Sequence, residues 1–428
     1  MWNTNLKFSR RQLLKLSASG LVLPKLASGA PNNSERKFLF VFCDGGWDPT
    51  FVFAPLYDNP HVYSDPTGTV TSANGLTFIE SPERPMVNQF FNDWADKCLI
   101  INGIDVSTVA HDRGKRLLMT GKPQGPDDWG ALISAYSEQT WTAPHLVVSG
   151  PTFVTYHPDS IVRIGEDGEL DYLLTGQVTY GPPETLYVDN RSESLISQYL
   201  QNRSRDRFDA ASQDVHMQRF ARNLGRSQPQ IESLIESTQD ISFVPSEGEY
   251  GYACDENFMG SAQIALQCFE AGLTRCAIVE DQGFCRMRWD SHGAIGEQSW
   301  HYDLLFDGLS QLMTELHSRY APSGNLLADE ITVVVCSELG RHPQLNAMGG
   351  KHHWPVTTAM IIGGVTGGRT VGGFDEQVLA SPIDLASGEP DPNGTKLTPG
   401  HLGATLLALA DIDPAPFVDA SPIMGIIQ

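Results

Sequence analysis

The chain has 428 residues and a formal charge of −22, from 29 lysines and arginines against 51 aspartates and glutamates. Its length and 41% apolar content can bury a large core, which excludes a small disulfide-stapled scaffold and favours one large α/β domain or two ordinary ones. The acidic balance argues against binding to nucleic acid or to an anionic membrane surface. Seven cysteines without a CxxC pair are too sparse for a disulfide framework, although Cys254, Cys268, Cys276 and Cys285 can supply one disulfide.

The first 30 residues predict a removable export segment. They carry five basic residues and no acidic one, with SRRQLLK at 9–15 followed by the apolar run LSASGLVLP. This pattern resembles a twin-arginine export signal, and Ser28 and Ala30 give a small-x-small cleavage pattern before Pro31. An amphipathic helix with chance arginines is the alternative, and the nine-residue run is too short to span a bilayer, which takes about 20 residues. We expect a periplasmic or secreted protein that meets the twin-arginine translocase, has no membrane anchor, and has a mature body of charge −27.

Six short runs of nearly continuous apolar residues follow, and such runs are typical of buried parallel strands. They are FLFVFC at 38–43, CLIING at 98–103, HLVVSG at 145–150, CAIVE at 276–280, ITVVVCS at 331–337 and AMIIGG at 359–364. Between the fourth and fifth runs, apolar residues recur at helical spacing over 305–316, which predicts a β-loop-α-β unit. We therefore expect an α/β fold with a central, mostly parallel sheet covered by helices.

Two stretches interrupt this alternation of strands and helices. Residues 150–185 are rich in Gly, Tyr, Pro and Asp and predict a long excursion, whereas the polar residues 186–240 predict helices. Together they predict a helical insert at about 150–250, within a domain that spans 31–428. This insert would form a lid or a side subdomain.

Polar residues gather where the predicted strands end, which is where ligands bind in an open parallel sheet. The carboxylates and imidazoles at these ends are Asp44 in CDGGWDPT, Asp290 and His292 in RWDSHG, Glu338 in SELGRHP, and His352 and His353 in GGKHHWP. Such oxygen and nitrogen ligands together are what a zinc, manganese or iron site requires. Taken singly, Asp44 can be a turn cap, and Glu338 with Arg341 can be a structural ion pair. We interpret the set, and not its single members, as a metal site.

The same segments together resemble a known family. The export segment, CDGGWDP, HDRGKRLLMTG, RWDSHG, SELGRHP with GGKHHWP, and TPGHLGATLLALADID are similar to those of a bacterial family of exported domains of unknown function, within the alkaline-phosphatase-like, sulfatase-like superfamily. The resemblance runs from about residue 36 to the C-terminus. It implies a three-layer α/β/α domain and a hydrolase of a phosphate or sulfate ester. It also implies one or two divalent ions at the strand ends, zinc, manganese or calcium.

The resemblance implies roles for single residues as well. The positions that match metal ligands are Asp44, Asp290, His292, Glu338, and His352 or His353. His111 stands where sulfatases have a catalytic cysteine or serine, and its imidazole cannot supply an alkoxide, so it is a ligand or a general acid or base. Leu339 replaces a ligand histidine. We name His111 and Arg341 as catalytic candidates, with the Arg341 guanidinium holding the anionic group of a small-molecule or glycan substrate.

Two other functions stay open. The first is a catalytically inactive member of the fold that binds a glycan or another anion, with Trp47, Trp289 and Trp354 stacking on sugar rings. The alternative for these tryptophans is that they pack as wall residues at the end of the sheet. The second is a structural partner of an exported complex, which depends only on the polar segment 186–240.

Overall fold

The computed structural model describes residues 35–164, 254 and 256–427, together with scattered helical positions between 192 and 218. The chain divides into two units, Pro31–Arg163 with Ser246–Gln428, and Met1–Ala30 with Ile164–Pro245. The predicted export segment and most of the predicted insert lie outside the described residues. The sheet, its helices and the candidate site all belong to the first unit.

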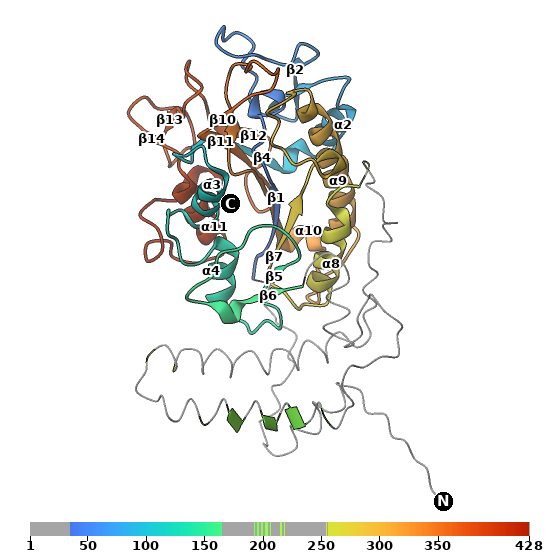
Figure 1. Cartoon of the computed structure of the whole chain (residues 1–428), viewed down its shortest axis with the longest axis vertical. Helices are drawn as coiled ribbons and strands as arrows, with labels where there is room; N and C mark the ends of the chain where they lie inside the picture. The colour runs from blue at the N-terminus through green and yellow to red at the C-terminus, as the bar shows by residue number, and fades with distance from the viewer. Residues whose placement is uncertain are drawn as a thin grey trace, which may run out of the picture. The chain divides into compact units, whose positions relative to one another are not determined.

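A mostly parallel sheet of eight strands forms the centre of this unit (Figure 1). Its strands are β1 (Lys37–Cys43), β4 (Cys98–Asp105), β5 (His145–Val147), β6 (Ile161–Arg163), β7 (Cys276–Asp281), β8 (Ile331–Cys336), β11 (Val356–Ile362) and β12 (Arg369–Gly372). Their order is β12-β4-β11-β8-β1-β7-β5-β6. Short antiparallel pairs outside the sheet are β2 (Thr69–Ala73) with β3 (Leu76–Glu80), β9 (Gly340–Arg341) with β10 (His353–Trp354), and β13 (Pro382–Ile383) with β14 (Thr395–Lys396).

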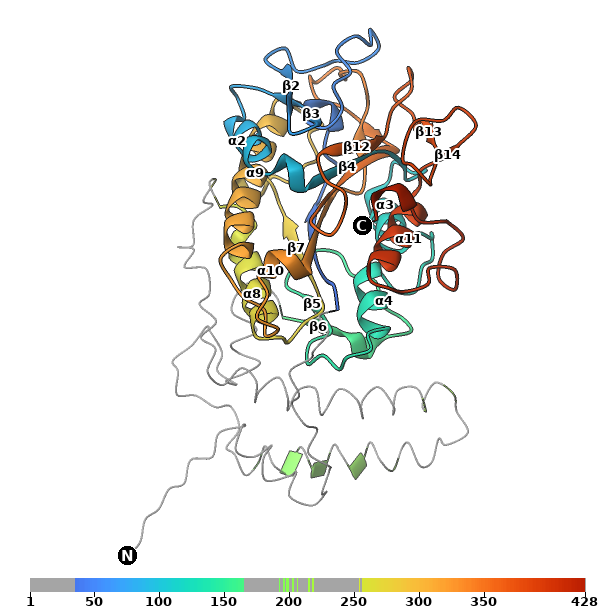
Figure 2. The same ribbon diagram turned by 180° about the vertical axis from the view of Figure 1, so that it is seen from behind.

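Helices cover both faces of the sheet, so the expected three-layer α/β/α architecture is confirmed (Figures 1 and 2). One layer holds α2 (Pro85–Trp94), α8 (Met259–Glu270), α9 (Glu297–Leu316) and α10 (Leu327–Glu330), and the other holds α3 (His111–Thr120), α4 (Trp129–Ala135) and α11 (Pro399–Leu409). No helix in the described part of the chain is both long and apolar enough to cross a bilayer.

All six predicted apolar runs contribute strands to the sheet, because their side chains are buried on both faces. In β1 every residue is buried, and Phe38, Phe40 and Phe42 join the core cluster that includes residues of α3, α4 and α11. The predicted helical stripe lies in α9, where Leu305 and Leu309 are fully buried. The hydrophobic pattern therefore predicted both the strands and the helix that connects β7 to β8.

One strand differs from the parallel direction that its apolar run suggested. β11 is antiparallel to both β8 and β4, whereas β1 is parallel to β7 and β8, β5 is parallel to β6 and β7, and β12 is parallel to β4. The segment between β8 and β11 contains the β9-β10 pair and no crossover helix, so the chain returns from the same edge at which β8 ends. This return places His353 beside the carboxyl ends of the parallel strands.

A disulfide joins Cys254 to Cys285, which is one of the pairings that the sequence left open. Cys285 lies in the loop that follows β7. The other five cysteines are buried thiols in the strands or helices, namely Cys43, Cys98, Cys268, Cys276 and Cys336.

The loop after β7 is fixed at its base by the buried carboxylate of Asp281, which is only 2% exposed. Its Oδ1 accepts hydrogen bonds from Gly283 N at 3.0 Å and from Trp289 Nε1 at 2.8 Å, near the two ends of the loop. Burial raises the pKa of Asp281 to about 6, although these two hydrogen bonds lower it. The ordinary value is 3.8, so the folded protein binds this proton more tightly than the unfolded chain does.

We expect Asp281 to make the free energy of unfolding fall as pH rises from about 4 to about 6. Its folded pKa of about 6 lies above the ordinary 3.8, so its contribution is complete below 3.8 and is lost as pH rises through about 6. The difference corresponds to about 3 kcal/mol. Urea unfolding at pH 4 and pH 7 measures it, and Asp281→Asn should remove about this amount of the pH dependence. An unchanged dependence in the variant would contradict the assignment.

Candidate functional site

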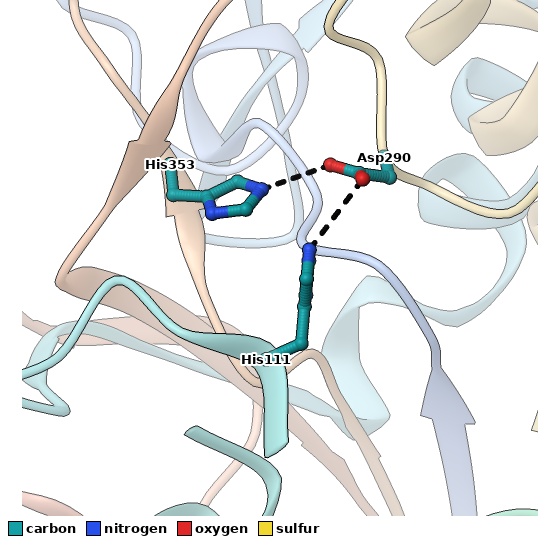
Figure 3. A group of neighbouring side chains, drawn as sticks. All are labelled: His111, Asp290 and His353. Carbon is teal, nitrogen blue, oxygen red and sulfur yellow. Dashed lines mark hydrogen bonds and ion pairs between the residues drawn. The ribbon is translucent and has the colours of Figure 1, made fainter. Parts of the chain in front are cut away.

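Three side chains from distant segments meet at the carboxyl edge of the sheet (Figure 3). His111 begins α3, Asp290 lies in the loop after β7, and His353 lies in β10. One ligand atom from each lies within 4.8 Å of the other two. His353 Nε2 is 3.0 Å from Asp290 Oδ1, and His111 Nε2 is 3.5 Å from Asp290 Oδ2. Two imidazoles and one carboxylate form a donor set that can hold a metal ion.

The imidazole of His111 is held from behind by Glu338. The two side chains are joined by a hydrogen bond of 2.7 Å between His111 Nδ1 and Glu338 Oε1, and Glu338 is fully buried. An ionised carboxylate can only accept, so Nδ1 carries the hydrogen and donates it. His111 Nε2 is buried, forms no hydrogen bond within the described residues, and faces Asp290. Glu338 therefore fixes which nitrogen His111 presents to the group.

The imidazole of His353 is held in the same way by a backbone carbonyl. Its Nδ1 donates to Val109 O at 2.7 Å, because a carbonyl oxygen only accepts. In the neutral ring Nε2 then carries a lone pair, and this atom is 3.0 Å from Asp290 Oδ1. His292 Nε2 adds another donor atom, 2.8 Å from His353 Nε2 and 3.2 Å from Asp290 Oδ1. Lone pairs on these three atoms would repel one another at such distances, so a proton or a cation must lie between the atoms.

The charges in the group are strongly coupled. Burial raises the pKa of Asp290, but contacts with His111, His353 and Arg341 outweigh it and hold the pKa well below its usual range. The contacts of His111 with Asp290 and Glu338 raise the pKa of His111 to about 9, although burial lowers it. Without a metal, His111 is therefore a cation at neutral pH and Asp290 an anion, and a metal ion that binds here must displace the proton.

Arg341 points inward and holds Asp290 to the turn after β1. Its guanidinium is buried and donates to Asp290 Oδ1 at 2.7 Å, to Trp289 O at 2.9 Å, to Gly46 O at 2.7 Å and to Gly45 O. Gly45 has φ +123°, and a Cβ there would lie 2.7 Å from Asp290 N. Because Gly45 and Gly46 have no side chains, the backbone that follows β1 can approach the Asp290 loop closely.

The structure places Asp44 outside this group and pairs it with two cations. Its carboxylate is buried, forms an ion pair with Lys115 Nζ through Oδ1, and lies 3.4 Å from Arg288 Nη1 through Oδ2. Glu338 also has other partners, since it accepts from Gly45 N at 3.0 Å as well as from His111.

Two further positions named from the sequence lie outside the group. His352 is exposed, and its ring centre is 5.6 Å from that of His292. Leu339, which stands in place of a ligand histidine, is fully buried. Of the predicted site residues, the structure therefore brings together His111, Asp290, His292 and His353, with Glu338 and Arg341 behind them.

Sequence reasoning missed Lys115 and Arg288. Lys115 follows His111 by four residues in one helix, so the two side chains share a helix face, and this spacing was a usable signal. Arg288 stands two residues before Asp290 in the segment CRMRWD. Two arginines separated by one residue are also common in an ordinary exposed loop, so the sequence carries no clear signal for Arg288.

Two of the three tryptophans near the site are packing residues. Trp47 and Trp289 are completely buried and lie edge to face with ring centres 6.2 Å apart, so neither can stack on a sugar. Trp354 is half-buried and donates through Nε1 to Val378 O at 2.7 Å.

Comparison with solved structures finds low-identity likenesses that cover most of the chain. Ps i-CgsB, solved in complex with k-i-k-neocarrahexaose, is 11% identical with a TM-score of 0.40, covering 91% of this chain and 75% of its own. The PsFucS1 sulfatase from Pseudoalteromonas sp. is 10% identical with a TM-score of 0.39, covering 90% and 70%. A protein in the alkaline phosphatase superfamily from Vibrio parahaemolyticus is 10% identical with a TM-score of 0.41, covering 95% and 76%. Scores this low say nothing about chemistry.

Comparison with curated proteins found no match. A family model described as "Protein of unknown function (DUF1501)" matches residues 35–418. This match spans the sheet, the helices on both of its faces and every residue of the candidate site. The chain therefore belongs to the DUF1501 family.

Proposed function

We propose that the protein is an exported, metal-dependent hydrolase of a phosphate or sulfate ester, in which His111, Asp290 and His353 hold one divalent cation. The observation that supports this is the convergence of their ligand atoms within 4.8 Å, with each imidazole fixed from behind. A carboxylate or a backbone carbonyl on the far nitrogen is the usual outer partner of a metal-binding histidine. A purely structural ion pair does not need two imidazoles oriented in this way.

The donor set favours zinc or manganese over calcium, because calcium takes oxygen ligands and this group is rich in imidazole nitrogens. His292 is the fourth donor, since its Nε2 lies 3.2 Å from Asp290 Oδ1. We propose one cation and not two, because Asp44 already has Lys115 and Arg288 as partners. A divalent cation bound here would supply Lewis-acid polarisation of a phosphoryl or sulfuryl oxygen.

The remaining residues of the site act by positioning. Arg341 holds the Asp290 carboxylate in place, and Glu338 holds the His111 ring so that Nε2 faces the group. Arg341, which the sequence suggested as an anion-binding residue, is therefore assigned to the support of Asp290. Such outer support keeps a metal site in one geometry.

A catalytically inactive, anion-binding protein is the second candidate, and the hydroxyl groups near the site favour it. Thr50 is buried and donates to Asp48 Oδ1 at 2.7 Å, Ser107 Oγ contacts Asp105 Oδ1 at 3.2 Å, and Thr108 Oγ1 accepts from Ala110 N at 3.3 Å, so each of these hydroxyls has a partner outside the group. His111, Asp290 and His353 themselves carry no hydroxyl or thiol that could serve as a nucleophile. Turnover separates the two candidates.

We expect the purified protein to bind about one zinc or manganese ion per chain. His353→Ala and His111→Ala should each weaken this binding by at least about 100-fold, the upper end of what loss of an outer contact costs. His352→Ala is the matched control, because this imidazole is adjacent in sequence but exposed. Calorimetry and elemental analysis measure affinity and stoichiometry. A protein without stoichiometric metal, or an equal loss in the control, would contradict the site.

Glu338→Gln should weaken metal binding by about 10-fold to 100-fold while the fold is kept. Glutamine retains an acceptor for Gly45 N but loses the charge that orients the His111 ring. Calorimetric titration with zinc measures the effect, and Glu297→Gln in α9 serves as the control. Wild-type affinity in Glu338→Gln would show that the carboxylate supports only the fold.

We expect slow hydrolysis of an aryl phosphate or an aryl sulfate, lost after treatment with a chelator and restored by zinc or manganese. His353→Ala should abolish turnover, because it removes a proposed ligand. Release of the aryl alcohol is the measurement. If metal and inorganic anions bind but neither ester is turned over, the inactive anion-binding candidate replaces the hydrolase.

A further inference from the structure

We infer that Lys115 and Arg288 form a binding subsite for a tetrahedral oxyanion, the sulfate or phosphate group of the ester, beside the metal group. This inference rests on the proposed function and deepens it by naming the residues that recognise the anionic group. Neither residue belongs to the metal group of His111, Asp290 and His353.

The two cations share a single carboxylate. Lys115 Nζ pairs with Asp44 Oδ1, and Arg288 Nη1 lies 3.4 Å from Asp44 Oδ2. Asp44 is buried, with a side chain only 4% exposed, whereas the Lys115 and Arg288 side chains are 20% and 62% exposed. The negative charge of Asp44 is therefore buried, and the positive charges of Lys115 and Arg288 lie nearer to solvent. The cluster therefore carries one positive charge in excess, on the side that a ligand reaches.

This excess charge adjoins the proposed metal ligands. Lys115 is one helical turn after His111 on the same face of α3. The Asp44 carbonyl accepts from Trp289 N at 2.9 Å, the residue between Arg288 and Asp290. Lys115 and Arg288 thus come from the two segments, α3 and the loop after β7, that also supply the proposed ligands His111 and Asp290.

Arg288 is suited to this role in a way that Arg341 is not. The Arg341 guanidinium is fully buried, and its donors are directed at backbone carbonyls and Asp290. The Arg288 guanidinium forms no hydrogen bond with the described residues, and its contact with Asp44 at 3.4 Å is an ion pair. Its planar set of N–H donors is therefore available, and it matches the spacing of two oxyanion oxygens.

The backbone around Arg288 has three residues in the left-handed region, which residues other than glycine rarely adopt. Arg288 has φ 62°, and Cys285 and Arg286, three and two residues earlier, have φ 51° and 54°. The loop is kept there by the disulfide of Cys285, by the hydrogen bonds of Asp281, and by a bond of 2.7 Å from Arg288 N to Gln282 O. Strained residues that their surroundings hold in place are concentrated at functional sites.

The same loop supplies a matched control in Arg286. Its side chain is 56% exposed, close to the 62% of Arg288, and its backbone is also left-handed. Arg286 pairs with Glu256 at 3.5 Å and not with Asp44. Replacing either arginine by glutamine removes one charge from one loop, so the two variants differ only in where that charge lay.

The test is calorimetric titration of the full chain, without metal and loaded with zinc, with inorganic sulfate and, separately, inorganic phosphate. Arg288→Gln should weaken binding of the preferred anion by about tenfold, the value of one charge-assisted hydrogen bond, while Arg286→Gln stays within about twofold. Lys115→Met should show a similar loss. Arg288→Gln decides the result if Lys115→Met does not fold. The preferred anion identifies the ester as a sulfate or a phosphate.

Unchanged anion affinity in Arg288→Gln, or an equal loss in Arg286→Gln, overturns the subsite. Zinc affinity of Arg288→Gln should equal that of the wild type, because Arg288 contacts none of the proposed ligands. If the protein binds no metal but anion binding depends on Arg288, the hydrolase proposal fails and the subsite stands. If zinc binds as proposed but anion binding does not depend on Arg288, the subsite fails and the metal site stands.

Discussion

The arrangement of the site depends on the buried guanidinium of Arg341. It joins three strand ends, because it follows β8, donates to the Gly45 and Gly46 carbonyls after β1, and donates to Asp290 in the loop after β7. A buried cation without partners would cost several kcal/mol, so these acceptors must stay in place around it. Asp290, whose side chain is 37% exposed, is thereby fixed at an edge where a loop carboxylate would otherwise be free to move.

Fixing Asp290 also decides what the two imidazoles face. His111 precedes Asp290 in the sequence and His353 follows it. The orientation of each ring is fixed by a hydrogen bond from its Nδ1, to Glu338 in His111 and to the Val109 carbonyl in His353. With both rings turned, their Nε2 atoms and the Asp290 oxygens are close enough to repel unless a proton or a cation lies among them. Without a metal His111 holds that proton, so a metal ion that binds here takes the place of a proton that is already shared by the group.

Much of the fold could be predicted from the sequence, because continuous apolar runs report burial on both faces directly. The direction of β11 could not, since a buried strand has the same pattern in either direction and only the connection through β9 and β10 sets it. The positions of the site residues at strand ends were also predictable. Their pairing was not, because the sequence does not show that Arg341 points inward or that Asp44 faces Lys115.

The pairing of Asp44 has a consequence for the chemistry of an acidic protein. The chain carries a net charge of −22, so an anionic ester approaches against the average field and needs a local positive charge. A metal ion supplies such a charge only while it is bound, whereas Lys115 and Arg288 are covalently part of the chain. In the proposed site, two sources of positive charge thus attract the anion. Lys115 and Arg288 beside Asp44 are the permanent source, and the metal ion bound at the Asp290 group is the exchangeable source. Capture of the anion and polarisation of its oxygen then become separable properties, carried by different residues.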